Sequence, residues 1–301
     1  MTFRFGLQSK KRDEITILDI LNILICGSFA FICIYPLYYI LINSLSSPGA
    51  VVRGVFFYPL EFTLRSYNEL WNIPGIQSSV IISILRTVVG SVYTTFCSSF
   101  AAYILTRRHL PFRKAFYRFF IVTMYINAGF IANYLLITSL GLRNNFLVYI
   151  LPYGVSAFYI ILIKTYIESM AASVWESAEI DGAGVARIYF SIILPLAKPI
   201  LACIIIFAAV FQWNAWADNL FFISGSRGRH LNTLQYLLYI NLQSALGAAF
   251  RETGGEAGVL NISPTTLRMA MTFITVLPIL CVYPFMQRHF TKGIMLGAVK
   301  G

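Results

Sequence analysis

Charge is what this 301-residue chain has least of. Asp, Glu, Lys and Arg together make up 12% of the residues, whereas hydrophobic residues make up 58% and the mean hydropathy is +0.72. Soluble domains carry about 25% charged residues. The composition therefore excludes an ordinary soluble fold and indicates a protein that crosses a membrane several times.

Residues suited to metal binding and catalysis are also few. The three histidines, His109, His230 and His289, are scattered, without metal-ligand spacing or a Ser/His/Asp grouping. The five cysteines fall within apolar runs and form no Cys-x-x-Cys pair, which favours packing over metal or disulfide bonding. A Walker-type Gly-x-x-x-x-Gly-Lys loop is missing as well. We therefore expect no catalytic site, metal or cofactor on this chain, with an intramembrane enzyme kept as an alternative.

Long apolar runs, by contrast, are abundant. A helix needs about 20 residues to cross the hydrocarbon core, whereas β-barrel strands give short alternating segments of about ten residues, which the chain lacks. The expected spans are residues 20–42, 80–106, 119–142, 144–163, 200–217 and 269–287. The sequence thus predicts an all-α membrane protein with six transmembrane helices, in one domain over residues 15–301 after a tail at 1–14. The first run is too long for a signal peptide and lacks a cleavage site, so we interpret it as a retained span.

Lys and Arg mark one side of these spans. They gather in the tail, in a tight loop at 107–118, in the segment 164–198 and after residue 287. The positive-inside rule then places both termini and the loop at about 167–199 in the cytoplasm, with outer segments at about 43–78 and 224–263. The net charge of +11 follows from this bias and favours anionic lipid headgroups over nucleic acid.

Three shorter elements are expected in or beside the outer segments. Residues 64–71 have the pattern of an amphipathic helix with aromatics at the headgroup level. Leucines recur at helical spacing over 231–246, which predicts an interfacial or cavity-capping helix. Ser263 and Pro264 suit the N-cap and first position of the last span.

A charged segment separates the fourth and fifth apolar runs. Ser173 and Glu176 have the spacing of a capping box, and Gly182 permits the left-handed turn that ends a helix. We therefore expect a helix of about eight residues, or ~12 Å, and a second short helix from Gly184. Pro195 and Pro199 then break the chain before the fifth span.

This short helix crosses the inner face between two spans. Trp175 and Ala178 can face the bundle or a partner while Glu176, Glu179 and Asp181 stay in water. A rigid helix held by two spans can transmit force from a soluble partner. On physical grounds alone, a surface helix that only fills the loop is as good an interpretation.

The residue pattern favours the first interpretation. Glu-x-Ala-x-x-x-Gly, followed after nine residues by Ile-x-Leu-Pro, resembles the EAA motif of permease subunits of binding-protein-dependent ABC importers. The matching residues are Glu176, Ala178, Gly182, Ile192, Leu194 and Pro195. Ile180-Asp181-Gly182-Ala183 agrees too, although Ser177 replaces the usual alanine and Ala171 stands where carbohydrate-type members commonly have proline. Trp213-Asn214 and residues 292–301 also look like carbohydrate-uptake permeases, most like the group serving oligosaccharides, including those from plant or algal polyuronides.

The resemblance implies a type I importer permease fold in the bacterial plasma membrane. The loop would act as a coupling helix in a cleft of a separate cytoplasmic ATPase, whose closure on ATP turns the cavity outward so that an external binding protein can release sugar into it. The implied partners are a second, homologous permease forming a heterodimer, two ATPase subunits that bind ATP and Mg, and an extracellular solute-binding lipoprotein. The implied ATPase-coupling residues are Glu176, Ser177, Ala178, Asp181, Gly182, Ala183 and Pro195.

Polar and aromatic residues within the apolar runs are candidates for lining a sugar pathway, because such groups are costly in hydrocarbon unless they line a cavity. The candidates are Tyr125, Asn127, Asn133, Gln212, Trp213, Asn214, Trp216, Asp218 and Asn219. For each of them, an interhelical hydrogen bond worth about 1 kcal/mol is an alternative. Arg86 and Arg268 either snorkel or face the cavity, where they would meet the carboxylates of an acidic oligosaccharide.

Two other transporter classes stay open. A secondary transporter would carry coupling carboxylates inside the membrane and inverted repeats, yet Asp19 and Asp218 lie near span ends and no repeat is evident. An ABC permease for amino acids or phosphate would share the fold, since only the resemblance points to carbohydrate.

Overall fold

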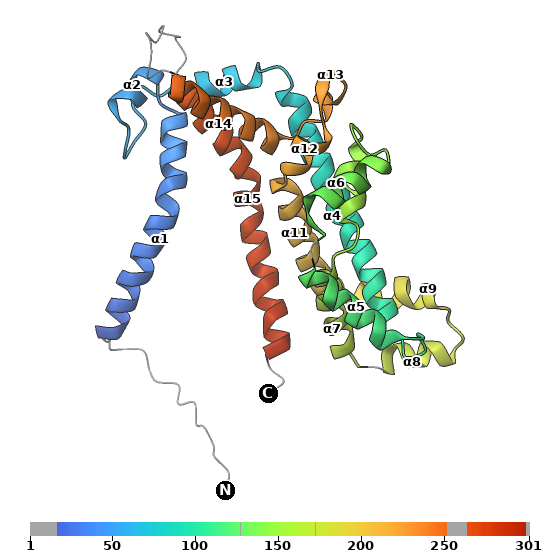
Figure 1. Ribbon diagram of the computed structural model, residues 1–301. Coiled ribbons are helices and arrows are strands. Elements are labelled where there is room, and N and C mark those ends of the chain that lie inside the picture. The colour runs from blue at the N-terminus through green and yellow to red at the C-terminus, as the bar shows by residue number, and fades with distance from the viewer. Residues whose placement is uncertain (1–16, 127, 172, 252–263, 299–301) are drawn as a thin grey trace. The chain divides into compact units, whose positions relative to one another are not determined.

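The computed structural model of this chain is built from helices, and the residues that it describes, 17–126, 128–171, 173–251 and 264–298, contain no strand (Figure 1). The chain divides into two units. One comprises residues 1–66 and 261–273, and the other residues 67–260 and 274–301.

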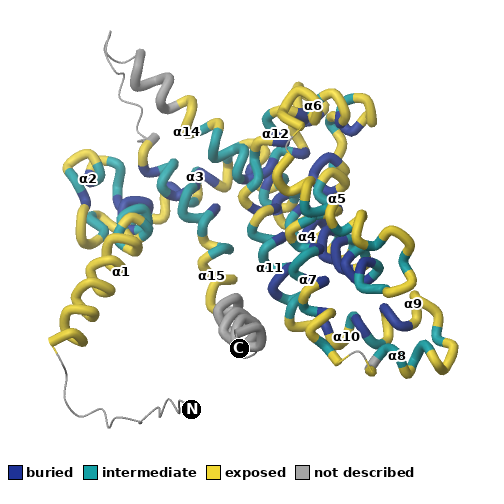
Figure 2. The backbone as a smooth tube through the Cα atoms, turned by 60° about the horizontal axis from the view of Figure 1, so that its bottom comes forward, coloured by how far each residue is buried: buried dark blue, intermediate teal, exposed yellow. Residues whose placement is uncertain are grey.

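The first unit contains one long apolar helix and a compact turn. Helix α1 (Ile17–Ser44) is exposed along most of its length (Figure 2), as expected of a surface that lipid covers. Helix α2 (Pro48–Arg53) begins with a proline after the N-cap Ser47, whose hydroxyl accepts a hydrogen bond from the amide of Ala50 at 3.2 Å. Hydrogen bonds from Ser47 and Arg53 hold the pKa of Glu61 below its ordinary value, so this carboxylate stays ionised to a lower pH than an ordinary glutamate.

Helix α4 (Ile76–Thr106) is the centre of the second unit and packs against α7 (Ala157–Ser169) and α11 (Lys198–Asn214) (Figure 1). Its buried face is rich in serine, threonine and glycine, which lets helices approach closely in a membrane. At Gly90 a Cβ atom would lie only 2.7 Å from Nε2 of Gln212. Small residues along α4 therefore determine how closely α11 can pack.

The remaining elements are short apart from two helices, α14 and α15. They are α3 (Arg65–Trp71), α5 (Arg113–Tyr125), α6 (Gly129–Ser139), η1 (Phe146–Tyr149), η2 (Leu151–Tyr153), α8 (Ser173–Ile180), α9 (Val185–Ile188), η3 (Tyr189–Ile193), α10 (Leu194–Leu196), α12 (Ala217–Phe222), α13 (Gly225–Gly228), η4 (Arg229–Leu231), α14 (Leu234–Arg251) and α15 (Pro264–Ala298). The short helix predicted at 64–71 and the helix predicted within 231–246 are thus both present, as α3 and α14. Pro264 is the first residue of α15, while Ser263 lies outside the described residues.

Three of the six expected spans are single helices, namely α1, α4 and α15. By length and composition the described residues hold three helices able to cross a membrane, or up to six if each of three bent helix pairs counts as one span. The all-α expectation is confirmed, and the exact count of six spans stays a prediction. The three bent pairs coincide with the third, fourth and fifth expected spans.

The third and fourth spans differ from a regular helix. Helix α5 begins at Arg113, so the basic residues from there to Arg118 belong to a helix and not to the predicted inner loop. The fourth expected span, 144–163, is not one continuous helix. Asn144 has a positive φ of 53°, short 3₁₀ turns follow, and the α-helix begins only at Ala157, at 48° to those turns, and continues to Ser169.

Proline affects the entry to the fifth span at two positions. The helical segment 185–196 meets α11 at 83° across Ala197, and Pro199 follows in the first turn of α11, as predicted. Pro195 does not end its helix. A π-helical turn precedes it, in which the amide of Leu194 donates to the carbonyl of Tyr189, and such a wide turn accommodates a residue that lacks an N–H.

A buried ion pair lies within the second unit. Arg86, 1% exposed, forms an ion pair with Asp218 and donates to its Oδ1 at 3.0 Å. The same guanidinium donates to Oε1 of Gln212 at 3.0 Å and to the carbonyl of Ala215 at 2.8 Å, and it lies 4.6 Å from the ring centre of Tyr149. We call Arg86, Tyr149, Gln212 and Asp218 the arginine cluster. It joins α4 to the end of α11 and the start of α12.

Hydrogen bonds continue from the arginine cluster to α14. Asp218 Oδ1 accepts from the amide of Asn219 at 2.9 Å, and the side chain of Asn219 accepts from the amide of Thr233 at 2.7 Å. The amide of Leu234, at the start of α14, donates to the Ser83 hydroxyl on α4 at 2.8 Å. Non-helical backbone at membrane depth needs such partners, so these side chains make the breaks around α12 possible.

The arginine cluster predicts a large stability effect. Arg86→Met should lower the free energy of unfolding by ~3–5 kcal/mol, because Asp218 is left buried without its partner. Arg86→Met combined with Asp218→Leu should lower it less than Arg86→Met alone. Thermal unfolding in detergent measures both.

Arg53→Met is the matched control, because it removes the arginine of the exposed pair with Glu61, and exposed pairs contribute little. An Arg86→Met variant that melts at the wild-type temperature would contradict the structural role of the pair.

Candidate coupling and substrate-pathway sites

The predicted short helix and its terminating turn are present. Helix α8 covers Ser173–Ile180, and Gly182 follows with a positive φ of 77°. The amide of Gly182 donates to the carbonyl of Glu179 at 3.0 Å, and that of Ala183 to the carbonyl of Ala178 at 2.9 Å. These bonds satisfy carbonyls at the helix end. Helix α9 then begins at Val185, directly after its N-cap Gly184, as predicted.

The capping-box prediction was wrong in detail. Ser173 is the first residue of α8 and not the residue before it. Its carbonyl accepts a hydrogen bond from the hydroxyl of Ser177 at 3.0 Å. The carboxylate of Glu176 points to Arg108, 3.3 Å away.

Helix α8 has an inward and an outward face. Trp175 and Ala178 pack against a buried apolar cluster that includes Ile163 and Tyr189, so the small size of Ala178 lets α8 approach its own bundle. On the outward face the side chain of Ile180 is 86% exposed. Ser177, Asp181, Gly182 and Pro195 are exposed too, and Ala183 is half-buried.

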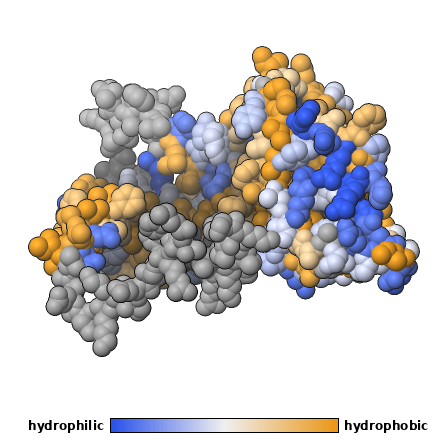
Figure 3. All heavy atoms as spheres, turned by 90° about the horizontal axis from the view of Figure 1, so that it is seen from below, coloured by the Kyte–Doolittle hydropathy of each residue, from blue (hydrophilic) through white to orange (hydrophobic). Residues whose placement is uncertain are grey.

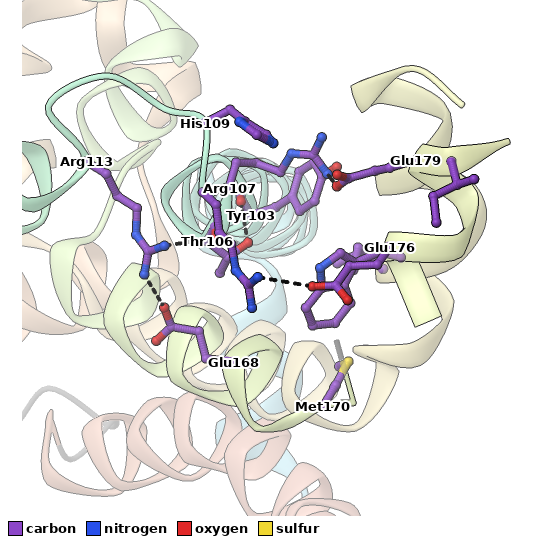
Figure 4. Close-up of a pocket in the computed structure, with 13 residues that line it drawn as sticks. Tyr103, Thr106, Arg107, His109, Arg113, Glu168, Met170, Glu176 and Glu179 are labelled. Carbon is purple, nitrogen blue, oxygen red and sulfur yellow. Dashed lines mark hydrogen bonds and ion pairs between the residues drawn. The ribbon is translucent and has the colours of Figure 1, made fainter. Parts of the chain in front are cut away.

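Arginines from the α4–α5 connection reach the acidic residues of α7 and α8. Arg107 pairs with Glu179, Arg108 with Glu176, and Arg113 with Glu168 at 3.0 Å (Figure 4). These residues line a cleft of about 710 Å³, with Trp175 and Ile180 also on its wall. Seen from below, hydrophilic residues gather on this part of the second unit (Figure 3). Sequence reasoning placed both the basic loop and the acidic helix in the cytoplasm but did not pair them.

Four of the nine pathway candidates are buried in the fold. Gln212, Asp218 and Asn219 belong to the arginine cluster and its extension, and all are at most 5% exposed. The indole nitrogen of Trp213 donates to the carbonyl of Thr275 at 2.9 Å. Each therefore serves a structural hydrogen bond, the alternative stated for them above.

Asn214 and Trp216 have accessible surface. Asn214 is exposed, and its Oδ1 accepts a hydrogen bond from Nε2 of Gln235 at 3.1 Å. The half-buried Trp216 stacks on Tyr239, with ring centres 4.1 Å apart and planes at 16°. Gln235 and Tyr239 lie on α14 and were missed, because attention to the leucine spacing concealed the polar face of that helix. The hydrogen bond between Asn214 and Gln235 and the stack of Trp216 on Tyr239 are two neighbouring contacts between the same segments. We call these four residues the amide–aromatic pair.

The remaining candidates lie elsewhere. Tyr125, at the end of α5, is 82% exposed, and Asn133 lines an open cleft of about 520 Å³ along α6. Asn127 lies outside the described residues. The expectation that Arg86 snorkels or faces a cavity was wrong, because Asp218 holds it inside the bundle; Arg268 is half-buried on α15. Among the described residues, no three His, Cys, Asp or Glu side chains come together as metal ligands would.

The chain is similar to known proteins over most of its length. The chain is 34% identical over 287 residues to protein LplC of Bacillus subtilis, with 95% of each chain covered. It is 33% identical to the polygalacturonan/rhamnogalacturonan transport system permease protein YtcP of the same organism, covering 91% of this chain and 94% of the relative. A crystal structure of a bacterial ABC transporter involved in the import of the acidic polysaccharide alginate contains a chain with a TM-score of 0.81 and 29% identity, covering 92% of this chain and 99% of that one.

The family assignment follows from a match to a protein family over two thirds of the chain and from the similarity to LplC. Residues 94–295, which include α8, Gly182 and Pro195, match the family described as binding-protein-dependent transport system inner membrane component. Members of this family are transporter permeases and not enzymes. The chain belongs to the family of inner membrane components of binding-protein-dependent transport systems.

Proposed function

We propose that this chain is the transmembrane permease subunit of an ATP-driven importer of oligosaccharides, working in the bacterial plasma membrane. The observation that carries the proposal is α8, a short helix with an exposed outward face, held at the end of the bundle by residues with the EAA spacing. The relatives named for polygalacturonan and alginate support the substrate class.

In this proposal the outward face of α8 contacts a separate ATPase. Ile180 is an apolar side chain left almost wholly in water, and such a residue amid polar neighbours suits an anchor buried by a partner. Ser177 and Asp181 flank it. Glu176 can add a polar contact, since its carboxylate remains half-exposed beside Arg108. Ala178 acts indirectly, by seating α8 on the bundle.

The remaining partners follow from the same mechanism. Two cytoplasmic ATPase subunits bind ATP and Mg, a second, homologous permease completes the passage, and an extracellular lipoprotein delivers the sugar. Closure of the ATPases moves α8 and turns the cavity outward. A secondary transporter is disfavoured. It would need a carboxylate within the membrane to bind the coupling ion or proton, and the carboxylate of Asp218 is already paired with Arg86.

The amide–aromatic pair is the part of this chain best suited to contact sugar. Stacked aromatic rings offer an apolar platform, and the two amides offer donors and acceptors that fix orientation. Gln235 and Tyr239 are half-buried, while Asn214 is exposed, so the group is accessible without being solvated on all sides.

Recognition of an acidic sugar has little basis in this chain's own cations. Arg86 is 1% exposed and its charge is neutralised by Asp218, so it is not available to a substrate carboxylate. Of the two arginines proposed to bind such carboxylates, only the half-buried Arg268 then remains. We therefore place discrimination for carboxylates on the binding protein and on the second permease, with this chain lining the passage.

Gly182 gives a sharp test of the coupling helix. A Cβ atom there would meet nothing within 4 Å, but the positive φ of 77° is strained for side chains, at about 1–2 kcal/mol. Gly182→Val should therefore leave the permease folded and assembled while reducing sugar-stimulated ATP hydrolysis and uptake. Gly182→Asn is the matched control, because asparagine tolerates this conformation. Wild-type coupling in the valine variant would argue against the role of the turn.

Trp216 tests the substrate pathway. Trp216→Ala should lower uptake by about ten-fold, equivalent to losing ~1.4 kcal/mol of interaction in the passage, with ATP hydrolysis still stimulated by the loaded binding protein. Transport by the reconstituted complex measures it. Trp71→Ala, at an exposed tryptophan on α3, is the control. Equal uptake by the wild type and Trp216→Ala would remove the residue from the pathway.

Substrate class is tested with matched oligomers. Reconstituted wild-type complex, supplied with its binding protein, should import oligogalacturonides in preference to neutral oligomers of equal length. A variant with Arg268→Gln should keep that preference, since we assign it to the other subunits. Equal import of neutral and acidic oligomers would contradict the acidic class and leave the importer assignment standing.

A further inference from the structure

The coupling segment is held by charge as well as by apolar packing. Arg107 directly follows α4, and its guanidinium pairs with Glu179 of α8 while lying 5.7 Å from the ring of Tyr103. Both partners are largely withdrawn from water, with side chains 17% and 31% exposed. Partial burial reduces the screening that weakens surface pairs. This pair is therefore the best protected of those joining the coupling helix to the bundle.

Two further arginines make similar contacts. Arg108 pairs with Glu176, one helical turn before Glu179, so two acidic residues on one face of α8 are both engaged. Arg113 pairs with Glu168 at 3.0 Å, and Glu168 also pairs with Lys164 at 2.6 Å. Figure 4 shows Arg107 after α4, Arg113 at the start of α5, Glu168 of α7, and Glu176 and Glu179 of α8 around the same cleft.

The placement of the pairs decides what moves with α8. Its apolar contacts, through Trp175 and Ala178, attach it to a cluster that several helices share, α4 among them. The ion pairs of Arg107 and Arg108 attach it also to the two residues that directly follow α4, one unbroken helix of 31 residues. Arg86 lies within this helix and Arg107 directly follows it, about 31 Å further along the helix axis at 1.5 Å per residue. Displacement of α8 can thus reach the arginine cluster through a single rigid element.

We propose that Arg107, Arg108 and Arg113 are positioning residues for transport, which clamp α8 and the end of α7 to the connection between α4 and α5, so that movement of α8 is delivered to α4. Arg107 and Arg108 directly follow α4, and Arg113, the first residue of α5, donates to the carbonyl of Thr106 at the end of α4 at 3.4 Å. The inference rests on the proposed function of α8 as the coupling helix. It adds a second route for force beside the covalent links to α7 and α9. The arginines touch no substrate and act through the two helices that they join.

Charge reversal and exchange test the clamp in the reconstituted complex of permeases, ATPases and binding protein. Arg107→Glu and Glu179→Arg should each lower the ratio of sugar imported to ATP hydrolysed by about ten-fold, within the range of ordinary coupling energies. The exchange variant carrying both changes should recover most of that ratio, because the pair is restored with its charges swapped. Arg107→Lys should retain it in large part.

Lys114→Glu is the matched control. Lys114 is exposed in the first turn of α5, and its reversal changes the net charge of the same cytoplasmic segment by the same amount as Arg107→Glu. It should leave the ratio unchanged. Melting temperature and recovery of the assembled complex are measured for every variant.

The outcomes separate the clamp from the importer assignment. A wild-type complex without ATP-dependent uptake overturns the proposed function and the clamp with it. A wild-type complex that transports, beside single variants with a normal ratio, overturns the clamp alone. The clamp is also overturned if the exchange variant regains assembly and melting temperature but not coupling, since the arginine would then serve stability only.

Discussion

The ion pair between Arg86 and Asp218 is the contact on which the second unit depends. An arginine is costly inside a membrane unless it is paired, and here it is 1% exposed. The same guanidinium also satisfies the carbonyl of Ala215, where α11 ends. One side chain thus neutralises a buried carboxylate and supplies the partner that a broken helix lacks. Without it, the break between α11 and α12 would leave polar groups unsatisfied.

This constraint explains why so many polar residues near the fifth span are unavailable to a substrate. The break between α11 and α12 is stabilised by the hydrogen bonds of Gln212 and Asp218 with Arg86. The side chain of Asn219 binds the amide of Thr233, just before α14. What remains accessible is the amide–aromatic pair, which the break itself creates by turning Trp216 toward Tyr239. The buried structural residues and the residues proposed to contact sugar are therefore neighbours in one segment.

Sequence reasoning succeeded where the determinants are local. The length of α8 and the turn at Gly182 that ends it follow from short-range rules and were predicted correctly, whereas the capping box at its start was not. The irregular start of the fourth expected span was not predicted, because uniform hydrophobicity does not distinguish 3₁₀ turns from an α-helix. Asn144 and Pro152 are the residues that mark this irregular start. Arg86 and Asp218 are 132 positions apart, and no local pattern encodes such a pairing. The same applies to Trp216 with Tyr239, whose contact depends on where α14 packs.

The two charged groupings of the second unit obey different physics, and this fits their different tasks. The arginine cluster is dry, so breaking it leaves an unpaired charge at high cost; it suits a fixed joint. The pairs of Arg107, Arg108 and Arg113 border a cleft and keep part of their surface in water, the pair of Arg107 with Glu179 the least. Each can therefore part and re-form at a smaller cost than the pair of Arg86 with Asp218. In the proposed mechanism, α8 moves in every transport cycle. The pairs at the cleft suit this movement, because together they attach α8 firmly while each pair alone can break and re-form. In the proposed mechanism, helix α4 has a rigid contact at Arg86 and more easily broken contacts beyond Thr106, as expected of an element that transmits motion.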